Sequence, residues 1–208
     1  MSDLTIVGRS SSHFTRVTQI FARELGVEYQ LHVVPDLLTP SRADYRGNPA
    51  LRIPVLETEE GAWFGALNIC RELARRAQPP LPVVWPEQLR DRTSANAQEL
   101  VLQGMATEVG LIMRTLASGE SSDAYEAKNR RSLVESLGWL DAHLLGAVES
   151  LPRSRGMSFL EVTSFCFLTH LEFRQVLDTS GYRRLNEFCR AFAERPGARD
   201  TPYRFDHA

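Results

Sequence analysis

The chain has 208 residues, and 24 basic against 26 acidic side chains leave a formal charge of -2. Apolar residues make up 43% and charged residues 24%, which is typical of globular proteins and excludes disordered or collagen-like chains. The balanced charge argues against nucleic acid and anionic membranes as partners, and the length favours two small domains.

The first third of the chain alternates β-type runs with helical stretches. Residues 4–7 form an apolar run that predicts a buried strand, and residues 28–34 alternate apolar and polar side chains as a second strand does. Between them, apolar residues recur every three or four positions over residues 13–25, which predicts an amphipathic helix. A hairpin over residues 55–64 and a helix over residues 66–76 follow. The predicted order is β-α-β, then β-β-α.

A proline-rich segment divides the chain. Residues 78–87 contain four prolines, which exclude a regular helix and a central strand. We therefore expect residues 78–88 to link a first domain, residues 1–77, to a second domain, residues 89–208.

Beyond the linker nearly every segment has helical periodicity. Residues 94–116 and 123–149 carry apolar side chains at steps of three and four and predict two long helices. Ser158 and Glu161 fit a capping box, in which the Ser hydroxyl accepts the amide of Glu161 and the carboxylate accepts the amide of Ser158. The helix that follows is apolar on almost every side, so we expect it at the centre of a bundle. A last helix begins near residue 182 and is expected to end before Pro196.

Cysteine use and hydropathy indicate the compartment. Three cysteines at wide spacing, Cys70, Cys166 and Cys189, speak against a disulfide framework and for a reducing compartment. The N-terminal residues contain no long apolar stretch, and no run approaches the roughly 18 to 20 apolar residues of a membrane span. We expect a cytoplasmic protein without a secretory signal.

Several site chemistries find little support in the residues. A thioredoxin-type oxidoreductase needs a cysteine at the first helix, and residues 8–13 contain none. The histidines are dispersed, and Cys166 and His170, one helical turn apart, lie on an apolar helix where core packing is the commoner role, so we expect no metal site. We find neither a phosphate-binding glycine motif nor evidence of a base and an acid that would make Ser11 part of a hydrolase triad.

Two motifs and the order of the elements resemble the glutathione S-transferase superfamily. Residues 48–56, Asn-Pro-Ala-Leu-Arg-Ile-Pro-Val-Leu, are similar to the family segment Asn-Pro-x-Gly-x-Val-Pro-x-Leu. Residues 11–17, Ser-Ser-His-Phe-Thr-Arg-Val, are similar to the Ser-Ser-x-x-x-Arg-Val opening of the first helix in serine-type and zeta-like members. The capping box at Ser158 and the ending around Pro196 match in kind and place. The resemblance covers nearly the whole chain and implies a thioredoxin-like α/β N-terminal domain followed by an all-α C-terminal bundle.

The resemblance implies that a serine at the first helix activates glutathione as co-substrate. Ser11 is expected to donate a hydrogen bond to the sulfur, while the helix dipole and free amides favour the thiolate. Ser12 and Ser10 remain alternatives, because an error of one residue in placing the turn would exchange them. Read without the resemblance, these serines form a turn and cap the helix.

The second motif implies a peptide-binding strand. In the family a cis bond precedes the second proline, which here is Pro54, and the backbone of Ile53 would pair with the cysteinyl part of glutathione. Arg52 is a candidate for the glycyl carboxylate, although an exposed arginine in a surface salt bridge is the commoner case.

Two departures from the family weaken the expectation of tight binding. Members usually carry Glu-Ser, or a related pair, where this chain has Gly65-Ala66, and those side chains hold the γ-glutamyl group. Hydrogen bonds of charged groups are worth roughly 1.5 to 3 kcal/mol each, so losing two weakens affinity by roughly two orders of magnitude or more, unless Asn68 or a second subunit compensates. The helix amides remain available to an anion. Leu51 replaces the motif's glycine, which suggests a loop of changed shape.

Three functional hypotheses follow. The leading one is a homodimeric glutathione S-transferase-like protein whose thiolate attacks a small hydrophobic electrophile between the domains. Four residues of the first bundle helix would line that second site, although their spacing also fits simple core packing: Met105, Glu108, Val109 and Ile112. The second is a non-catalytic binding or scaffold module that has lost the γ-glutamyl site. The third is an enzyme that uses another thiol or an acidic ligand in the same groove.

Overall fold

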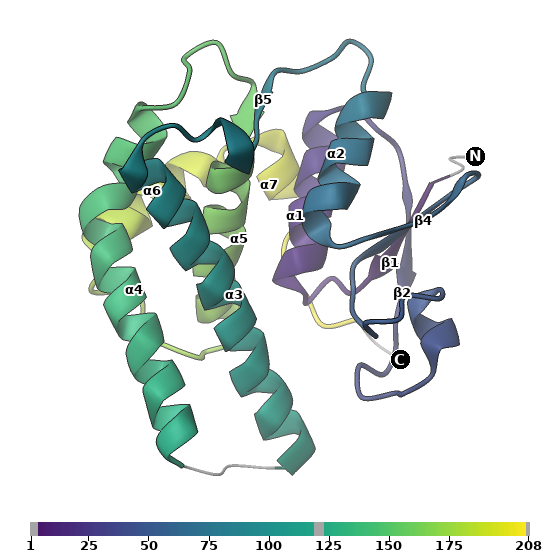
Figure 1. Ribbon diagram of the computed structural model, residues 1–208, viewed down its shortest axis with the longest axis horizontal. Coiled ribbons are helices and arrows are strands. Elements are labelled where there is room, and N and C mark those ends of the chain that lie inside the picture. Colours follow the sequence, from purple (N-terminus) through teal and green to yellow (C-terminus); the bar gives the residue numbers. More distant parts are fainter. Residues whose placement is uncertain (1–3, 119–122, 207–208) are drawn as a thin grey trace. The chain divides into compact units, whose positions relative to one another are not determined.

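The computed structural model describes residues 4–118 and 123–206 (Figure 1). The chain divides into two compact units, one of Met1–Val83 with Ala193–Ala208 and one of Val84–Phe192. The units confirm the predicted fold class, a thioredoxin-like sheet-and-helix part and a helical part. The residues from Ala193 onward pack on the first unit. The predicted domain limits, residues 1–77 and 89–208, stay a prediction.

The first unit is built on a four-stranded sheet. Its strand order is β2-β1-β3-β4, with β2 parallel to β1 and with β3 and β4 antiparallel to their neighbours. The strands are β1 (Thr5–Gly8), β2 (Gln30–Val33), β3 (Val55–Thr58) and β4 (Gly61–Phe64). The predicted β-α-β and β-β-α order is therefore confirmed, although β2 is shorter than residues 28–34.

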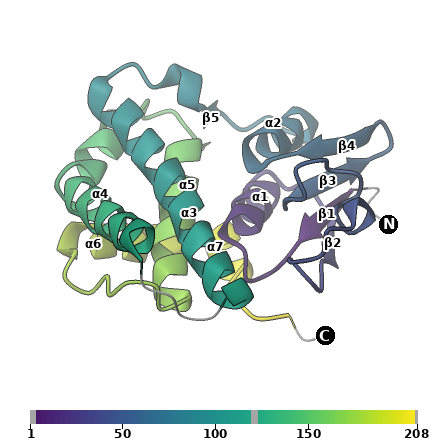
Figure 2. The same cartoon turned by 60° about the horizontal axis from the view of Figure 1, so that its bottom comes forward.

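Two helices cover one face of this sheet. They are α1 (His13–Glu24) and α2 (Ala66–Arg76), and they pack against each other (Figures 1 and 2). Side chains alternate along a strand, so the paired residues Ile6 and Leu56, both fully buried, face these helices. The apolar stripe of α1 coincides with the face that is buried against the sheet and α2. This burial explains why residues 13–24 fold as a helix on the sheet.

The segment between β2 and β3 covers the other face of the sheet. Val7 and Val55 form a buried cluster there with Val34 and Tyr45, the last residue of the short helix η1 (Arg42–Tyr45). Burial raises the pKa of the Tyr45 hydroxyl, with Asp36 and Asp44 adding to the effect. The hydroxyl therefore stays protonated and donates to the Leu37 carbonyl oxygen at 3.0 Å. This buried tyrosine holds the long connection against the sheet.

The second unit consists mainly of helices. Its long helices α3 (Arg92–Ser118) and α4 (Ala124–Glu149) lie side by side, and α5 (Phe159–Phe173) packs against α3 (Figures 1 and 2). The contact with α5 requires Gly104, because an added Cβ there would lie 2.5 Å from the Phe167 ring. The remaining elements are η2 (Pro86–Gln88), α6 (Arg183–Ala193) and a two-stranded sheet of β5 (Val83–Val84) and β6 (Met157–Ser158). That small sheet was not predicted.

Among the described residues, α3 contains one stretch, Arg92–Ala117, that is long and apolar enough to cross a membrane. The same helix packs against α4 and α5 and carries the ionisable Glu108 near its middle. A core helix of a helical bundle can be equally long and apolar. The packing of α3 against α4 and α5 is that of such a core helix.

The start of α5 differs from the predicted capping box in one half. The amide of Glu161 donates to the Ser158 Oγ at 3.0 Å, as expected. The Glu161 carboxylate accepts the Ser158 hydroxyl at 2.6 Å and pairs with Arg155 at 2.9 Å. The carboxylate thus also anchors the preceding loop. Pro196, expected to end the last helix, begins a further one, α7 (Pro196–Asp200), because proline is well suited to the first helical position.

The C-terminal segment is tied to α1 by polar contacts. Glu24, whose side chain is 9% exposed, accepts the Gly197 amide at 2.8 Å and pairs with Arg195 at 2.5 Å. Arg16 donates to the Ala198 carbonyl oxygen at 3.2 Å. These contacts explain why residues after 192 belong to the first unit.

We predict that Glu24→Ala lowers the free energy of unfolding of the first unit by about 2 to 4 kcal/mol, because it removes the acceptor of a buried amide and of a guanidinium. Arg23→Ala is the control, since Arg23 and Asp200 lie 3.8 Å apart with both side chains about half exposed. Exposed pairs contribute less than about 1 kcal/mol. Urea denaturation of both variants checks this, and equal effects would contradict it.

Candidate functional site

The turn between β1 and α1, residues Arg9–Ser12, is called the serine turn here. The Ser12 amide donates to the Arg9 carbonyl oxygen at 3.1 Å, and the Ser12 Oγ accepts the Thr15 amide at 3.3 Å as the N-cap of α1. Gly8 allows the helix to begin this close to the strand, because an added Cβ would lie 2.4 Å from the Thr15 Oγ1. Ser12 therefore has the capping role that serine commonly has at this position.

The other two serines of the turn are buried. Ser10 is 5% and Ser11 is 8% exposed. The Ser10 amide donates to the Asp206 Oδ2 at 2.8 Å, a contact between residues 196 positions apart. The structure thus places Ser10, Ser11 and Ser12 together at the positive end of the α1 dipole. Ser11 as the thiol-binding hydroxyl stays a prediction.

The buried side chain of Asn48 joins two parts of the loop before β3. Asn48 is 4% exposed; its Nδ2 donates to the Arg52 carbonyl oxygen at 2.8 Å, and its Oδ1 accepts the Ala50 amide at 3.0 Å. The peptide bond between Ile53 and Pro54 is cis, as the resemblance implied, and so is the bond between Gln78 and Pro79. The Arg52 side chain is exposed, so its expected contact with a carboxylate stays a prediction.

Leu51 has a φ of 51°, in the left-handed region that favours glycine. The replacement of the motif's glycine by Leu51 therefore leaves a left-handed backbone at this position. Its side chain packs against the cluster of Val7, Val34, Tyr45 and Val55. We infer that this packing offsets the roughly 1 to 2 kcal/mol that a left-handed conformation costs a residue with a Cβ.

The start of α2 offers backbone rather than side chains. Gly65, the N-cap residue, has a φ of 82° and makes no side-chain cap. Asn68, considered above as a compensating group, donates from its Nδ2 to the Phe64 carbonyl oxygen at 3.2 Å. The first amides of α2 are the groups that this terminus can present to an anion.

Strand register brings these three segments to one end of the sheet. Val7 pairs with Val55, so the residues just before β3, Ile53 and Pro54, lie beside the end of β1 and the serine turn. Val55 also pairs with Phe64, and the Gly65 amide donates to the Pro54 carbonyl oxygen at 3.4 Å. Three features therefore converge within the first unit. They are the hydroxyl-bearing N-terminus of α1, the irregular segment before β3 and the N-terminus of α2. This set can bind an extended, anionic peptide-like molecule.

The predicted electrophile-binding residues lie on α3. The side chains of Met105 and Glu108 are fully buried, and those of Val109 and Ile112 are partly buried. Their role in substrate binding stays a prediction.

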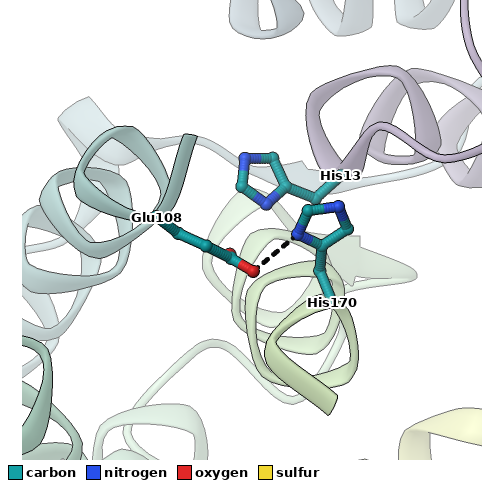
Figure 3. A group of neighbouring side chains, drawn as sticks. All are labelled: His13, Glu108 and His170. Atoms are coloured by element: carbon teal, nitrogen blue, oxygen red, sulfur yellow. Dashed lines mark hydrogen bonds and ion pairs between the residues drawn. The ribbon is translucent and has the colours of Figure 1, made fainter. Parts of the chain in front are cut away.

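Glu108 has a partner that the sequence analysis missed. The Glu108 Oε1 lies 2.7 Å from the Nδ1 of His170 on α5, and both side chains are almost wholly buried (Figure 3). The sequence analysis considered His170 only with Cys166, because residues 62 positions apart give no local spacing signal. His13, also labelled in Figure 3, belongs to the first unit. The predicted absence of a metal stays a prediction.

We predict that Asn48→Ala destabilises the first unit by about 1 to 3 kcal/mol, because it removes two partly buried hydrogen bonds that each contribute roughly 0.5 to 1.5 kcal/mol. The matched control is Asn68→Ala, whose single hydrogen bond is exposed and should contribute less than about 0.5 kcal/mol. Urea denaturation measures both. An Asn48 effect no larger than the Asn68 effect would show that the loop has other supports.

Comparisons with known proteins agree with this geometry. Residues 11–76 match the family model of the glutathione S-transferase N-terminal domain. No curated protein gives a significant match. A glutathione S-transferase from Methylobacillus flagellatus, with glutathione bound, is 22% identical and has a TM-score of 0.74, covering 96% of this chain and 98% of its own.

Two further solved structures are similar over almost the whole chain. A glutathione transferase family member from Pseudomonas fluorescens, with bound glutathione, is 19% identical with a TM-score of 0.76, covering 97% of this chain and 99% of its own. A glutathione S-transferase from Methylobacterium radiotolerans, in complex with glutathione sulfonate, is 17% identical with a TM-score of 0.73, covering 99% and 97%. The chain thus has the glutathione S-transferase fold, and its residues 11–76 match the family model of the N-terminal domain of these proteins.

Proposed function

We propose that the chain binds glutathione at the end of the sheet formed by the serine turn, Ile53-Pro54 and the start of α2, and conjugates it through its sulfur to a small electrophile. The observation that carries the proposal is the strand register, which brings these three segments together. Structures of similar fold hold glutathione, which supports the choice of ligand. The predicted cytoplasmic location and homodimeric state belong to the same proposal.

The chemistry required of the site is to keep a thiol ionised. A free thiol has a pKa near 8.5, so only a few per cent is thiolate at neutral pH. Ser11 donates a hydrogen bond to the sulfur, and the N-terminal amides of α1 add positive potential. The thiol proton passes to solvent, and a sulfur electron pair then forms a bond to the electrophilic carbon of the second substrate. The bond from that carbon to a leaving group breaks at the same centre, and the leaving group departs with the bonding electron pair.

The γ-glutamyl end of the ligand is the weak part of this site. Gly65 and Ala66 have no side-chain hydrogen-bonding groups, so only the α2 amides meet that end. The positive φ of Gly65 disfavours the acidic side chain that the family commonly carries there. This observation favours one alternative, a binding or scaffold module that has kept the fold and lost the co-substrate. The alternative that uses another thiol or an acidic ligand also remains open.

Calorimetry with Ser11→Ala tests the leading proposal. We expect wild-type protein to bind glutathione at millimolar concentration, and the variant to keep affinity within about threefold. The variant should lose the thiolate absorbance of bound glutathione, and its conjugation rate should fall by about 10². Absence of binding to the wild type would overturn the transferase proposal. Unchanged absorbance and rate would remove Ser11 and point to Ser12 or a tyrosine.

A gain of affinity tests the γ-glutamyl end. Ala66→Ser restores a hydroxyl at the first residue of α2, and one hydrogen bond to a charged group should tighten glutathione binding about tenfold. Ala74→Ser, farther along the same helix, is the matched control and should leave affinity unchanged. The measurement is the same calorimetric titration. Equal affinities of the two variants would show that the ligand does not reach α2.

A further inference from the structure

We propose that Asp206 is a positioning residue of the serine turn and that its negative charge raises the pKa of a thiol held there. This rests on the proposed function in naming glutathione as the thiol. It goes beyond that function because it assigns to the C-terminal segment an effect on the pKa of the bound thiol. The carrying observation is the hydrogen bond from the Ser10 amide to the Asp206 Oδ2, 2.8 Å long.

The contact between Ser10 and Asp206 joins two segments that are each packed in the first unit. The Asp206 side chain is 9% exposed. The C-terminal segment is anchored before it by Arg16, which donates to the Ala198 carbonyl oxygen and lies over the Tyr203 ring at 4.2 Å. Asp206 is therefore held against the turn by a segment that is itself packed on α1.

The carboxylate lies at the N-terminal end of α1. The N-terminus of a helix attracts anions, and Asp206 places a carboxylate at the residue before Ser11. Consecutive Cα atoms lie about 3.8 Å apart, so the carboxylate is within roughly 10 Å of the Ser11 side chain. That distance does not exceed the Debye length of about 10 Å at 0.1 M salt, and burial reduces screening further. Two anions, the carboxylate and a thiolate, then share one helix terminus.

Other charges of the first unit modify this field. Arg204 is the nearest described cation, with its Nε 4.0 Å from the Asp206 Oδ1, but its side chain is 68% exposed and solvated. Ser10 also lines an open hollow of about 320 Å³ that contains charged residues of both signs. The titratable and charged residues around the turn and this hollow are Arg9, His13, Arg16, Arg23, Glu28, Tyr29, Asp200 and Arg204. Asp206 is the anion directly bonded to the turn.

Two substitutions of Asp206 separate the effect of its negative charge from the effect of its hydrogen bond to the turn. Asp206→Asn keeps an oxygen that accepts the Ser10 amide, so the turn stays in place while the charge is lost. Asp206→Ala removes both. If the carboxylate acts through its charge, Asp206→Asn lowers the pKa of a thiol at the turn and leaves the turn in place. Asp206→Ala loosens the turn.

A reporter thiol makes the test independent of glutathione. The pKa of the new thiol in Ser11→Cys is measured from thiolate absorbance, alone and combined with Asp206→Asn, with Ser11→Ala as the spectral blank. We expect the pKa to fall by about one unit when Asp206 is neutralised. Asp200→Asn is the matched control, because it removes the same charge from the same segment beside Arg23, at the other end of α1. Asp200 lines the same hollow as Ser10 but is not bonded to the turn, so its neutralisation should lower the pKa by less than half as much.

Each outcome decides the proposal. An unchanged or raised pKa in the Asp206→Asn background would overturn it, as would an equal fall with Asp200→Asn. Ser12→Cys provides a second reporter on the same turn if Ser11→Cys does not fold. Failure of the proposed function is seen separately, as absence of glutathione binding to the wild type by calorimetry. Where glutathione does bind, the pH–rate profile of Asp206→Asn should move to lower pH by the same shift, with KM for glutathione within about threefold of wild type.

Discussion

The pairing of β1 with β3, and of β3 with β4, is the constraint on which the candidate site depends. Val55 pairs with Val7 on one side and with Phe64 on the other. A shift of one residue in either pairing would move the buried side chains of the sheet to the wrong face, so the register is strongly specified. Three segments that are remote in sequence are thereby fixed at one edge: the serine turn, Ile53-Pro54 and the start of α2. The geometry of the site thus follows from packing of the sheet.

The helix that supplies the positive potential is held at both ends by the same segment. Glu24 in the last turn of α1 binds Arg195 and the Gly197 amide, while the turn before α1 binds Asp206. The C-terminal segment is therefore hydrogen-bonded to both ends of α1. A helix dipole acts on a bound anion only if the helix terminus stays in place, and these contacts hold the terminus.

Local patterns in the sequence predicted the elements well, because each has a period or a boundary residue of its own. The helix over residues 66–76 was predicted with the observed limits, and Ser158 was predicted as the residue that caps the start of α5. The cis bond before Pro54 came from family resemblance, since local sequence alone favours trans.

Contacts between distant residues were not predicted, because they leave no local signal. The bond between Ser10 and Asp206, and the pair of Glu108 and His170, each join segments far apart along the chain. Asn48 was quoted only as part of a motif, and its two side-chain hydrogen bonds within the loop were missed. An asparagine directly before a proline is a turn signal that could have indicated this role.

Two replacements at the edge of the sheet have opposite physical consequences, and both bear on the proposed binding of glutathione. Leu51 keeps a left-handed backbone although its side chain differs from the motif's glycine. Gly65 instead has a backbone conformation that disfavours any side chain, so the acidic group cannot simply be restored there. The edge has therefore kept its backbone shape and lost side-chain hydrogen bonds. Recognition by backbone amides depends on an extended shape and a negative charge more than on the γ-glutamyl ammonium, because amide donors cannot pair with a cation. We therefore expect this site to discriminate less strongly between glutathione and other small acidic thiols than one that carries the acidic and hydroxyl side chains.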